Sequence, residues 1–189
     1  MAKRKLQDIA NLKELIFWSY ANLAMAHFAV SRQDRVYSRL SYIIRSRLFA
    51  GLMSGKMKLG PMLDEEQVKI KYSDVCAYCG DNADISIDHI IPKILQGSNS
   101  ADNLIRVCKC CNSSKGGKDL LEWYFKRNEF PSIFVLRRYL KLVYQYCYEN
   151  NLLDISIDEA IIATLPFDVK LIPIDYPTPD QLVLYKQKL

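Results

Sequence analysis

The stretch CAYCGDNADISIDHIIPK, from Cys76 to Lys93, contains the residues that decide how the centre of this chain folds. Cys76 and Cys79 stand at the spacing at which two thiolates bind one metal ion. His89, one of two histidines in the chain, follows directly after Asp88. The alternation of polar and apolar residues in ADISIDH predicts a short strand that ends at this Asp–His pair. The stretch therefore joins half of a metal site to a pair of titratable side chains.

A second cysteine pair, Cys108 and Cys111, lies downstream at the same spacing. Two such pairs supply four thiolates for a tetrahedral zinc ion, and a site closed by four protein ligands is structural rather than catalytic. The expected ligands of this structural zinc are Cys76, Cys79, Cys108 and Cys111. Cys110 would break the spacing and is left out of the set, and Cys147 is expected in the core of a helix.

A closed zinc site leaves His89 free for other chemistry. Asp88 and Asn112 offer a carboxylate and an amide oxygen, which suit a hard cation such as Mg²⁺. We expect the zinc and the strand pair to bring these two residues together. A neutral imidazole beside such a cation can deprotonate a water, which predicts a hydrolytic site for phosphodiesters. The alternatives are a hydrogen-bonded pair at a strand end for Asp88 and His89, and a helix cap for Asn112.

Together with the later stretch SADNLIRVCKCCNSSKGGKDLLEWY, this region resembles the HNH endonucleases, or ββα-metal nucleases, in the form framed by a four-cysteine zinc. The resemblance extends from about Cys76 to Phe125. It rests on both cysteine pairs, the Asp–His pair, Pro92, the DNL sequence at 102–104 and the CNSSKG sequence at 111–116. Because these features occur in the family's order, chance agreement is a poor explanation.

The resemblance implies a role for each matching residue. His89 would be the general base, and Asp88 and Asn112 would hold a catalytic Mg²⁺ or Mn²⁺. Asn103 would complete the catalytic set by orienting the loop and the base. Lys115 would contact phosphate.

Positive charge is concentrated in the first third of the chain. The whole chain has 26 Lys and Arg against 21 Asp and Glu. The first 60 residues contain eleven basic and three acidic residues, a net charge of +8, whereas the remainder has a net charge of −3. Such an imbalance favours a polyanionic partner, although a solvated helix surface is an equal alternative.

A helix is predicted from an N-cap at Ser31 to about Gly55. Within it, Arg32, Arg35 and Arg39 stand at steps of three and four, so that they would share one face. The candidates for nucleic-acid binding are Lys115, Lys118, Arg32, Arg35 and Arg39.

We predict an α+β chain that is mostly helical around a central ββα-metal motif. The expected regions are a basic helical region at 1–60, the HNH motif with its zinc site at 61–130, and a helical region with an extended tail at 131–189. A first helix is expected over 5–30. Further helices are expected over PSIFVLRRYLKLVYQYCYENNLLD and after a capping box of Ser156 and Glu159.

The sequence shows neither a signal peptide nor an apolar run of transmembrane length. We therefore expect a cytoplasmic protein without a membrane partner, in a compartment where disulfides are rare and cysteines serve metals.

The most probable function by this reasoning is metal-dependent cleavage of double-stranded DNA in a restriction, phage or defence context. The flanking helices would either form a homodimer or complete the core. The alternatives are a catalytically inactive, zinc-stabilised nucleic-acid-binding protein and a zinc-stabilised interaction scaffold. The joint presence of Asp88, His89 and Asn112 favours the nuclease.

Overall fold

The computed structural model describes residues 4–60 and 74–186, and its α+β fold agrees with the prediction. The described helices are α1 (Leu12–Ser31), α2 (Arg39–Met53), α4 (Lys109–Lys115), α5 (Leu120–Lys126), α6 (Ile133–Glu149) and α7 (Ile157–Ile162). The strands are β1 (Ile85–His89) and β2 (Leu104–Cys108). The 3-10 turns are η1 (Leu6–Asp8), η2 (Lys93–Leu95), η3 (Ala101–Asn103), η4 (Val169–Leu171) and η5 (Pro179–Gln181). The expected boundary after residue 60 adjoins a segment, 61–73, that lies outside the described residues.

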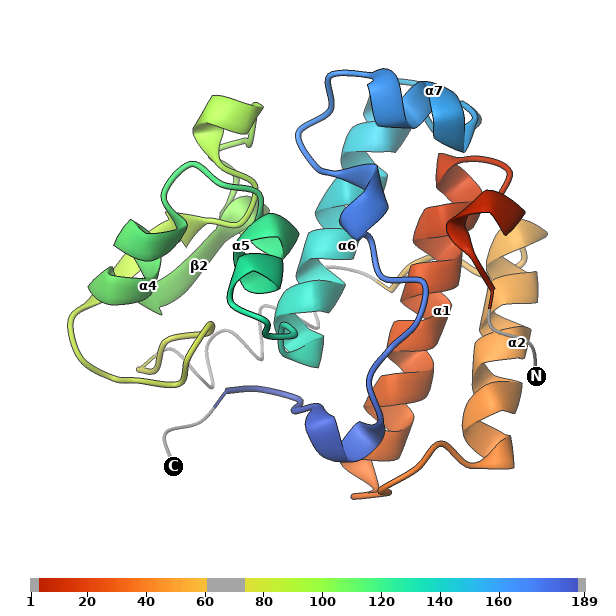
Figure 1. Ribbon diagram of the computed structural model, residues 1–189, viewed down its shortest axis with the longest axis horizontal. Coiled ribbons are helices and arrows are strands. Elements are labelled where there is room, and N and C mark those ends of the chain that lie inside the picture. Colours follow the sequence, from red (N-terminus) through yellow and green to blue (C-terminus); the bar gives the residue numbers. More distant parts are fainter. Residues whose placement is uncertain (1–3, 61–73, 187–189) are drawn as a thin grey trace.

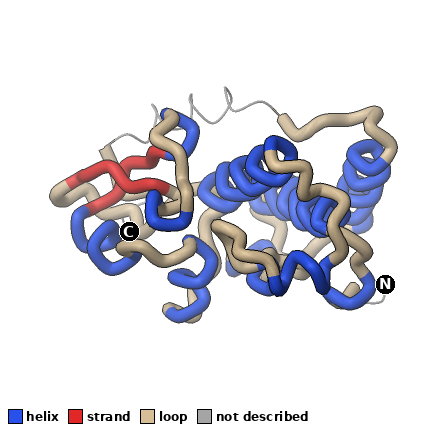
Figure 2. Tube along the Cα trace, turned by 90° about the horizontal axis from the view of Figure 1, so that it is seen from above, coloured by secondary structure: helices blue, strands red, loops and turns tan. Residues whose placement is uncertain are grey.

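The strands and the long helices occupy opposite ends of the molecule. Figure 1 shows β2 and α4 at one end, α1 and α2 at the other, and α6 between them; the view from above in Figure 2 shows the same separation. Helix α1 packs against both α2 and α6, and twelve of its 20 residues are buried. It is therefore the central element of the helical end. The part of the chain that is described contains no helix both long and apolar enough to span a membrane.

The first helix begins later than predicted. Residues 6–8 form only the turn η1, and α1 starts at Leu12 after Asn11, whose side chain accepts a hydrogen bond from the Glu14 N–H at 2.9 Å. A side-chain oxygen at this position satisfies an N–H that the helix itself leaves unpaired, which fixes the start.

The predicted start of the second helix at Ser31 is wrong. Ser31 is the last residue of α1, and α2 begins at Arg39 with Ser38 as its N-cap. Ser38 and Ser41 exchange hydrogen bonds in a capping box, which fixes the start of α2 at Arg39. The backbone of Gln33 has a φ of 59°, which no helix accommodates.

The predicted helical face of Arg32, Arg35 and Arg39 therefore does not exist. Arg32 and Arg35 lie in the loop between α1 and α2, and only Arg39 is helical. All three side chains are exposed, and Arg32 lies 3.7 Å from the Asp34 carboxylate.

The predicted helices of the C-terminal third are confirmed. Helix α6 follows the N-cap Ser132, one residue after Pro131. Ser156 and Glu159 form the expected capping box of α7, with the Ser156 N–H donating to the Glu159 carboxylate at 3.0 Å.

The predicted strand at ADISIDH is present as β1, and it pairs antiparallel with β2, as the expected ββα motif requires. Ile85 lies opposite Cys108, and His89 lies opposite Leu104. This register places the end of β1, with the Asp–His pair, beside the start of β2, and it places the beginning of β1 beside the second cysteine pair. Helix α4 follows β2 without a break and packs on both strands.

Helix α6 links the two ends of the molecule. The fully buried guanidinium of Arg138 donates to the backbone oxygens of Asp102 at 2.6 Å and Ala101 at 2.8 Å. The next residue of the same helix is Tyr139, whose hydroxyl donates to the carboxylate of Asp119, the N-cap of α5, at 2.7 Å. The strand end is thus attached to the helical end by buried polar contacts.

The C-terminal tail runs along α1. The Trp18 indole donates to the backbone oxygen of Ile174 at 2.9 Å, and the Tyr37 hydroxyl donates to that of Pro177 at 2.7 Å. Further on, the N–H of Ile133 at the start of α6 donates to the oxygen of Val183. The tail therefore contributes to the helical core and is not a separate extension.

Candidate active site and zinc centre

The four expected cysteines come together in space. The sulfur atoms of the cluster lie within 4.8 Å of one another: Cys76, Cys79, Cys108 and Cys111. A tetrahedral zinc with Zn–S bonds of about 2.3 Å separates its sulfurs by about 3.8 Å, and the sulfurs of Cys79 and Cys108 are 3.8 Å apart. The residues therefore fit a zinc ion. Cys110, exposed on α4, and Cys147, buried in α6, lie outside the cluster.

Local turns form each half of this cluster. After the first pair, Gly80 has a φ of 84°, and its N–H donates to the Cys76 oxygen at 2.8 Å. Glycine adopts this left-handed conformation without steric strain. In the second pair, Cys108 is the N-cap of α4, and its sulfur accepts from the Cys111 N–H at 3.4 Å. The antiparallel register then places the two halves side by side.

One face of β1 meets α4. Because side chains alternate along a strand, Ser86 and Asp88 point to the same side. The Asn112 amide donates to the Ser86 hydroxyl and to the Ile87 oxygen, both at 3.1 Å. One turn later on α4, the Lys115 ammonium lies 3.0 Å from the Asp88 carboxylate. The helix is thereby held along β1 with Asn112 near its middle and Lys115 near its end.

Asp88 is buried and its carboxylate has two partners on the same oxygen. The Lys115 ammonium and the Tyr78 hydroxyl, at 2.8 Å, both reach Oδ2. Burial lowers the pKa of Lys115, and the Asp88 charge opposes that shift. Burial and the same carboxylate raise the pKa of Tyr78 well above its usual range, so that its hydroxyl keeps its proton.

His89 is half-buried at the end of β1, and its ring is held by a loop residue. The Nε2 atom lies 2.9 Å from the side-chain oxygen of Asn99. An amide oxygen only accepts hydrogen bonds, so this contact places a proton on Nε2 and leaves Nδ1 as the basic nitrogen. The other histidine, His27, lies in α1, where burial and Arg137 lower its pKa.

Asn103 is buried and holds the loop between the strands. Its side chain accepts from the Ile91 N–H at 2.8 Å and donates to the oxygens of Ile91 and Ser98 at 2.9 and 2.8 Å. Gly97 passes so close that a Cβ on it would lie 1.8 Å from the Ile91 oxygen. Asn103 therefore shapes the loop that carries Asn99, and through Asn99 it reaches His89.

The residues expected to contact phosphate separate into two groups. Lys118 is exposed, with its ammonium near the Ser114 oxygen at 3.0 Å. Lys115 is fully buried, and besides Asp88 it contacts the His89 backbone oxygen at 2.8 Å. The Lys115 ammonium therefore compensates a buried carboxylate, and its expected contact with phosphate stays a prediction.

The sequence reasoning missed three residues that shape this site: Tyr78, Gly97 and Asn99. Tyr78 lies between the two cysteines of the first pair. An aromatic residue between two expected metal ligands was a sequence signal for a side chain packed beside the metal site. Asn99 stands in a loop rich in Ser, Gly and Asn, and nothing in the sequence separates it from its neighbours.

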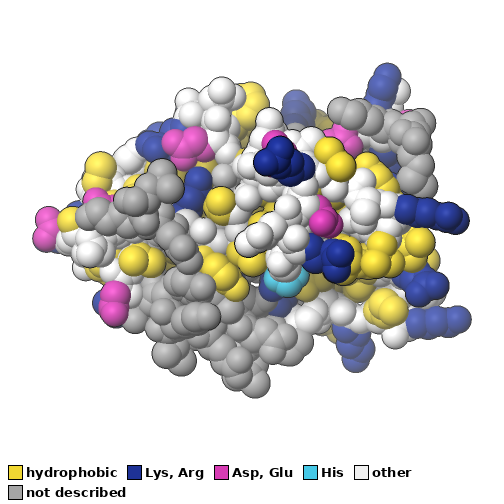
Figure 3. Space-filling model, turned by 90° about the horizontal axis from the view of Figure 1, so that it is seen from below, with side chains coloured by type: hydrophobic (Ala, Val, Ile, Leu, Met, Phe, Trp, Pro, Cys, Tyr) yellow, Lys and Arg dark blue, Asp and Glu magenta, His cyan; other side chains and the backbone are white. Residues whose placement is uncertain are grey.

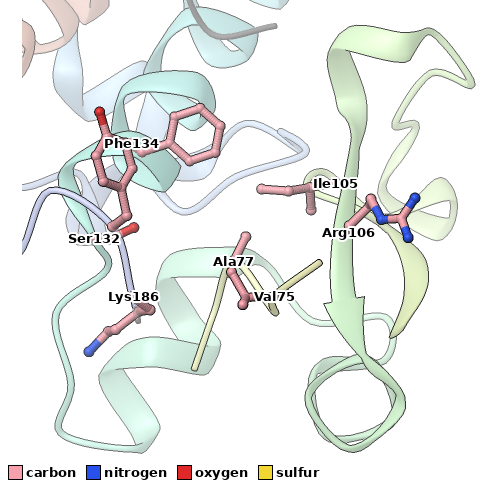
Figure 4. A pocket seen from close by; sticks show the side chains of 8 residues that line it. Val75, Ala77, Ile105, Arg106, Ser132, Phe134 and Lys186 are labelled. Carbon is pink, nitrogen blue, oxygen red and sulfur yellow. The ribbon is translucent and has the colours of Figure 1, made fainter. Parts of the chain in front are cut away.

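A pocket lies between β2 and the start of α6. Figure 4 shows Ile105, Ala77 and Phe134 directed toward it and the Arg106 guanidinium directed away. Its lining is mostly apolar and includes none of the candidate catalytic residues. The candidate catalytic residues Asp88, His89 and Asn112 lie instead on β1 and α4.

Comparison with known proteins agrees with this geometry. Residues 76–122 match the family described as HNH endonuclease. A segment of 52 residues, 25% of this chain, is 46% identical to the CRISPR-associated endonuclease Cas9 of Corynebacterium diphtheriae (strain ATCC 700971 / NCTC 13129 / Biotype gravis). That segment amounts to 5% of the Cas9 chain. No solved structure matches the chain.

The ββα arrangement, the four-cysteine cluster and these matches define an HNH endonuclease domain at residues 76–122. The helices outside that range lie beyond the family match, so the class of the domain does not by itself describe the whole chain.

Proposed function

We propose that the protein is a metal-dependent HNH endonuclease that hydrolyses phosphodiester bonds in double-stranded DNA. The observation that carries the proposal is the His89 ring, whose Nε2 atom is held by Asn99. The preceding residue, Asp88, is held by Tyr78 and Lys115. A base with one nitrogen fixed and the other available is the arrangement that general-base catalysis requires.

The residues present fit a hard divalent cation. Both hydrogen bonds recorded for the Asn112 side chain use its nitrogen, and both donors to Asp88 use Oδ2. One oxygen of each side chain therefore remains for a ligand role, within the described residues. Bound Mg²⁺ or Mn²⁺ would supply charge neutralisation at the phosphate and the leaving oxygen. Zinc would occupy the four-cysteine cluster as a structural ion.

His89 performs the proton transfer in this proposal. Its Nδ1 atom accepts a proton from a water, which then attacks phosphorus while the bond from phosphorus to the leaving oxygen of the DNA strand breaks. The Asn99 contact restrains rotation of the ring and leaves Nδ1 as the nitrogen that takes the proton. The Asp88 and Asn112 oxygens would hold the cation, which would supply charge neutralisation at the phosphate.

Exposed positive charge supports a nucleic-acid substrate. Residues 35–60 contain six basic and no acidic residues. The Arg45 guanidinium packs over the Trp18 and Tyr42 rings. The Arg35 and Arg39 side chains are exposed and can reach a bound polyanion. Figure 3 shows Lys and Arg side chains gathered at the end of the molecule formed by α2 and the preceding loop. We propose that this end, together with Lys118, binds the phosphate backbone.

Assembly and location are part of the proposal. Exposed Leu40 and Met53 on α2 are compatible with a homodimer that cuts both strands, which sedimentation analysis of the purified protein tests. The free cysteines and the zinc cluster suit the reducing cytoplasm, where we place the protein in a restriction, phage or defence context.

The test is DNA cleavage by the purified protein in Mg²⁺, in Mn²⁺ and in EDTA, with supercoiled plasmid, linear duplex, single-stranded DNA and RNA in parallel. We expect metal-dependent cleavage of duplex DNA and a loss of at least about 100-fold in His89→Ala, because general-base catalysis contributes that much or more. Zinc content should be unchanged. His27→Ala is the matched control and should cut like the unsubstituted protein. Salt-dependent DNA binding without cleavage would instead support the inactive binding protein.

A further inference from the structure

Tyr78 connects the zinc cluster to the candidate catalytic carboxylate. It stands between the ligands Cys76 and Cys79, and its ring is 1% exposed. The ring packs against Trp123 and Tyr124, with centroids 5.2 and 6.1 Å away. Its hydroxyl points out of this aromatic cluster and donates to Asp88 Oδ2 at 2.8 Å. The position of the first cysteine pair therefore determines where the hydroxyl lies.

Lys115 reaches the same oxygen from the opposite element. Its ammonium is fully buried, 3.0 Å from Asp88 Oδ2 and 2.8 Å from the His89 oxygen. A buried ammonium is stable only when it is paired and hydrogen-bonded, and both conditions are met here. It follows one turn after Asn112 on α4, directly behind the second cysteine pair.

Two donors on one carboxylate oxygen prevent rotation of that carboxylate. The Oδ2 atom is occupied from the zinc cluster by Tyr78 and from α4 by Lys115, so Oδ1 is the oxygen that remains to bind a cation. The hydroxyl of Tyr78 is the donor in this contact, because a carboxylate oxygen only accepts hydrogen bonds.

We propose that Tyr78 is a positioning residue, through which the zinc-binding turn orients Asp88 for the catalytic cation, and that Lys115 completes this clamp instead of binding phosphate. The inference rests on the cation site of the proposed function. It makes the zinc centre a part of the catalytic geometry in addition to its structural role.

Direct Mn²⁺ binding tests the role of Tyr78 without relying on activity. The free Mn²⁺ signal in electron paramagnetic resonance is titrated with zinc-loaded protein in the absence of DNA. Tyr78→Phe removes only the hydroxyl, and we expect Mn²⁺ affinity to fall by about tenfold, as is typical when a partner of a metal ligand is lost. The same titration with Asp88→Asn measures how much of the Mn²⁺ binding depends on Asp88 and therefore belongs to this site.

Tyr124→Phe is the matched control. Tyr124 is as buried as Tyr78 and contacts its ring, but its hydroxyl lies 3.5 Å from the Tyr78 backbone oxygen and not at Asp88. This variant should bind Mn²⁺ like the unsubstituted protein, and both variants should retain zinc. Equal Mn²⁺ affinity in Tyr78→Phe and the unsubstituted protein would overturn the inference. So would an equal loss in both variants, or the absence of Asp88-dependent Mn²⁺ binding.

Cleavage measured in the same preparations separates this inference from the proposed function. If the protein cuts DNA and Tyr78→Phe binds Mn²⁺ normally, the nuclease stands and the positioning role fails. If Mn²⁺ binding falls as expected but no variant cuts DNA, the positioning role stands and the nuclease fails.

The salt dependence of DNA binding tests Lys115. A lysine that neutralises one phosphate contributes about 0.9 to the slope of log affinity against log salt. We expect Lys118→Met to reduce the slope by about that amount and Lys115→Met to leave it unchanged. An equal reduction in Lys115→Met would show that Lys115 binds phosphate and would overturn its assignment. If Lys115→Met does not fold, Tyr78→Phe still decides the main inference.

Discussion

At the scale of single residues, the candidate base is held by a side chain that the family motif does not include. Asn99 contacts His89 Nε2 at 2.9 Å, and the buried Asn103 holds the loop on which Asn99 lies. Asn103, the asparagine of the family motif, therefore does not contact the His89 ring directly and reaches it only through the loop that carries Asn99. The predicted role of the buried Asn103 would therefore be to position the candidate base and not to contact substrate.

Replacement of Asn99 should slow catalysis without affecting zinc. We expect Asn99→Ala to lower kcat by about tenfold, because partners that orient a functional imidazole have effects of this order. Asn99→Asp keeps a side-chain oxygen that can accept from His89 Nε2, so its kcat should be closer to that of the unsubstituted protein than the kcat of Asn99→Ala is. Its carboxylate stabilises the imidazolium, so the acidic limb of the pH–rate profile should move to higher pH. Profiles identical to that of the unsubstituted protein in both variants would exclude the contact from the mechanism.

The Gly97 backbone has no room for a side chain. In Gly97→Ala the new Cβ would lie 1.8 Å from the Ile91 oxygen and 2.9 Å from the Asn103 amide nitrogen. We expect the free energy of unfolding to fall by about 1–3 kcal/mol, the usual range for overpacking, as measured by urea denaturation. Gly60→Ala is the control, because its nearest neighbour, the Tyr20 hydroxyl, would lie at 3.5 Å. Equal stability of the two variants would contradict the close approach.

At the scale of elements, zinc bound by the four-cysteine cluster would add to the small apolar core of the ββα unit. Two five-residue strands and the seven-residue helix α4 offer little apolar surface. Structural zinc in zinc-finger peptides contributes about 10–16 kcal/mol of apparent binding free energy, which is large compared with the stability of a typical domain. The register of β1 and β2 is therefore held at one end by the metal site and at the other by the Asn103 contacts.

Adjacent cysteines on α4 provide a direct test of the ligand set. Cys111→Ser should lose bound zinc and make the 76–122 segment sensitive to protease, because one sulfur of the cluster is removed. Cys110→Ser alters a neighbouring thiol that lies outside the cluster and should retain zinc. Zinc content by atomic emission and limited proteolysis are the measurements. Full zinc occupancy in Cys111→Ser would show that the ligand set is wrong.

At the scale of the whole molecule, α6 connects the 76–122 domain to the helical end through buried polar contacts. The buried Arg138 contacts two backbone oxygens beside Asn103, and Tyr139 contacts the N-cap of α5. The exposed arginines before and on α2 lie at the other end from β2 and α4 (Figure 1). DNA bound at both ends would therefore be held in a fixed orientation relative to the candidate active site.

The basic end should contribute to DNA affinity but not to the chemistry. Replacing Arg35 and Arg39 together by alanine should reduce the salt slope of binding by up to about 1.8, at about 0.9 for each phosphate contact. At saturating DNA, kcat should change little. Replacing Lys126 and Arg127 by alanine removes the same charge from residues already paired with Glu122 and Glu129. If the two pairs of substitutions weaken binding equally, net charge and not this surface is responsible.

The sequence by itself determined the features that depend on spacing along the chain. Two cysteines separated by two residues can bind one ion, alternating polar and apolar residues form a strand, and Ser156 with Glu159 caps a helix. Each of these patterns acts over a few neighbouring residues. The α+β class and the four-cysteine cluster followed correctly from such patterns.

Tertiary structure alone decided which of several locally acceptable options occurs. Ser31 and Ser38 are both suitable N-caps, and the choice of Ser38 is accompanied by a contact between Tyr37 and Pro177, 140 residues apart. Lys115 satisfies the family motif as a surface or a buried residue, and only the packing of α4 on β1 directs it to Asp88. Such choices depend on burial and on partners distant in sequence, and no local pattern contains that information.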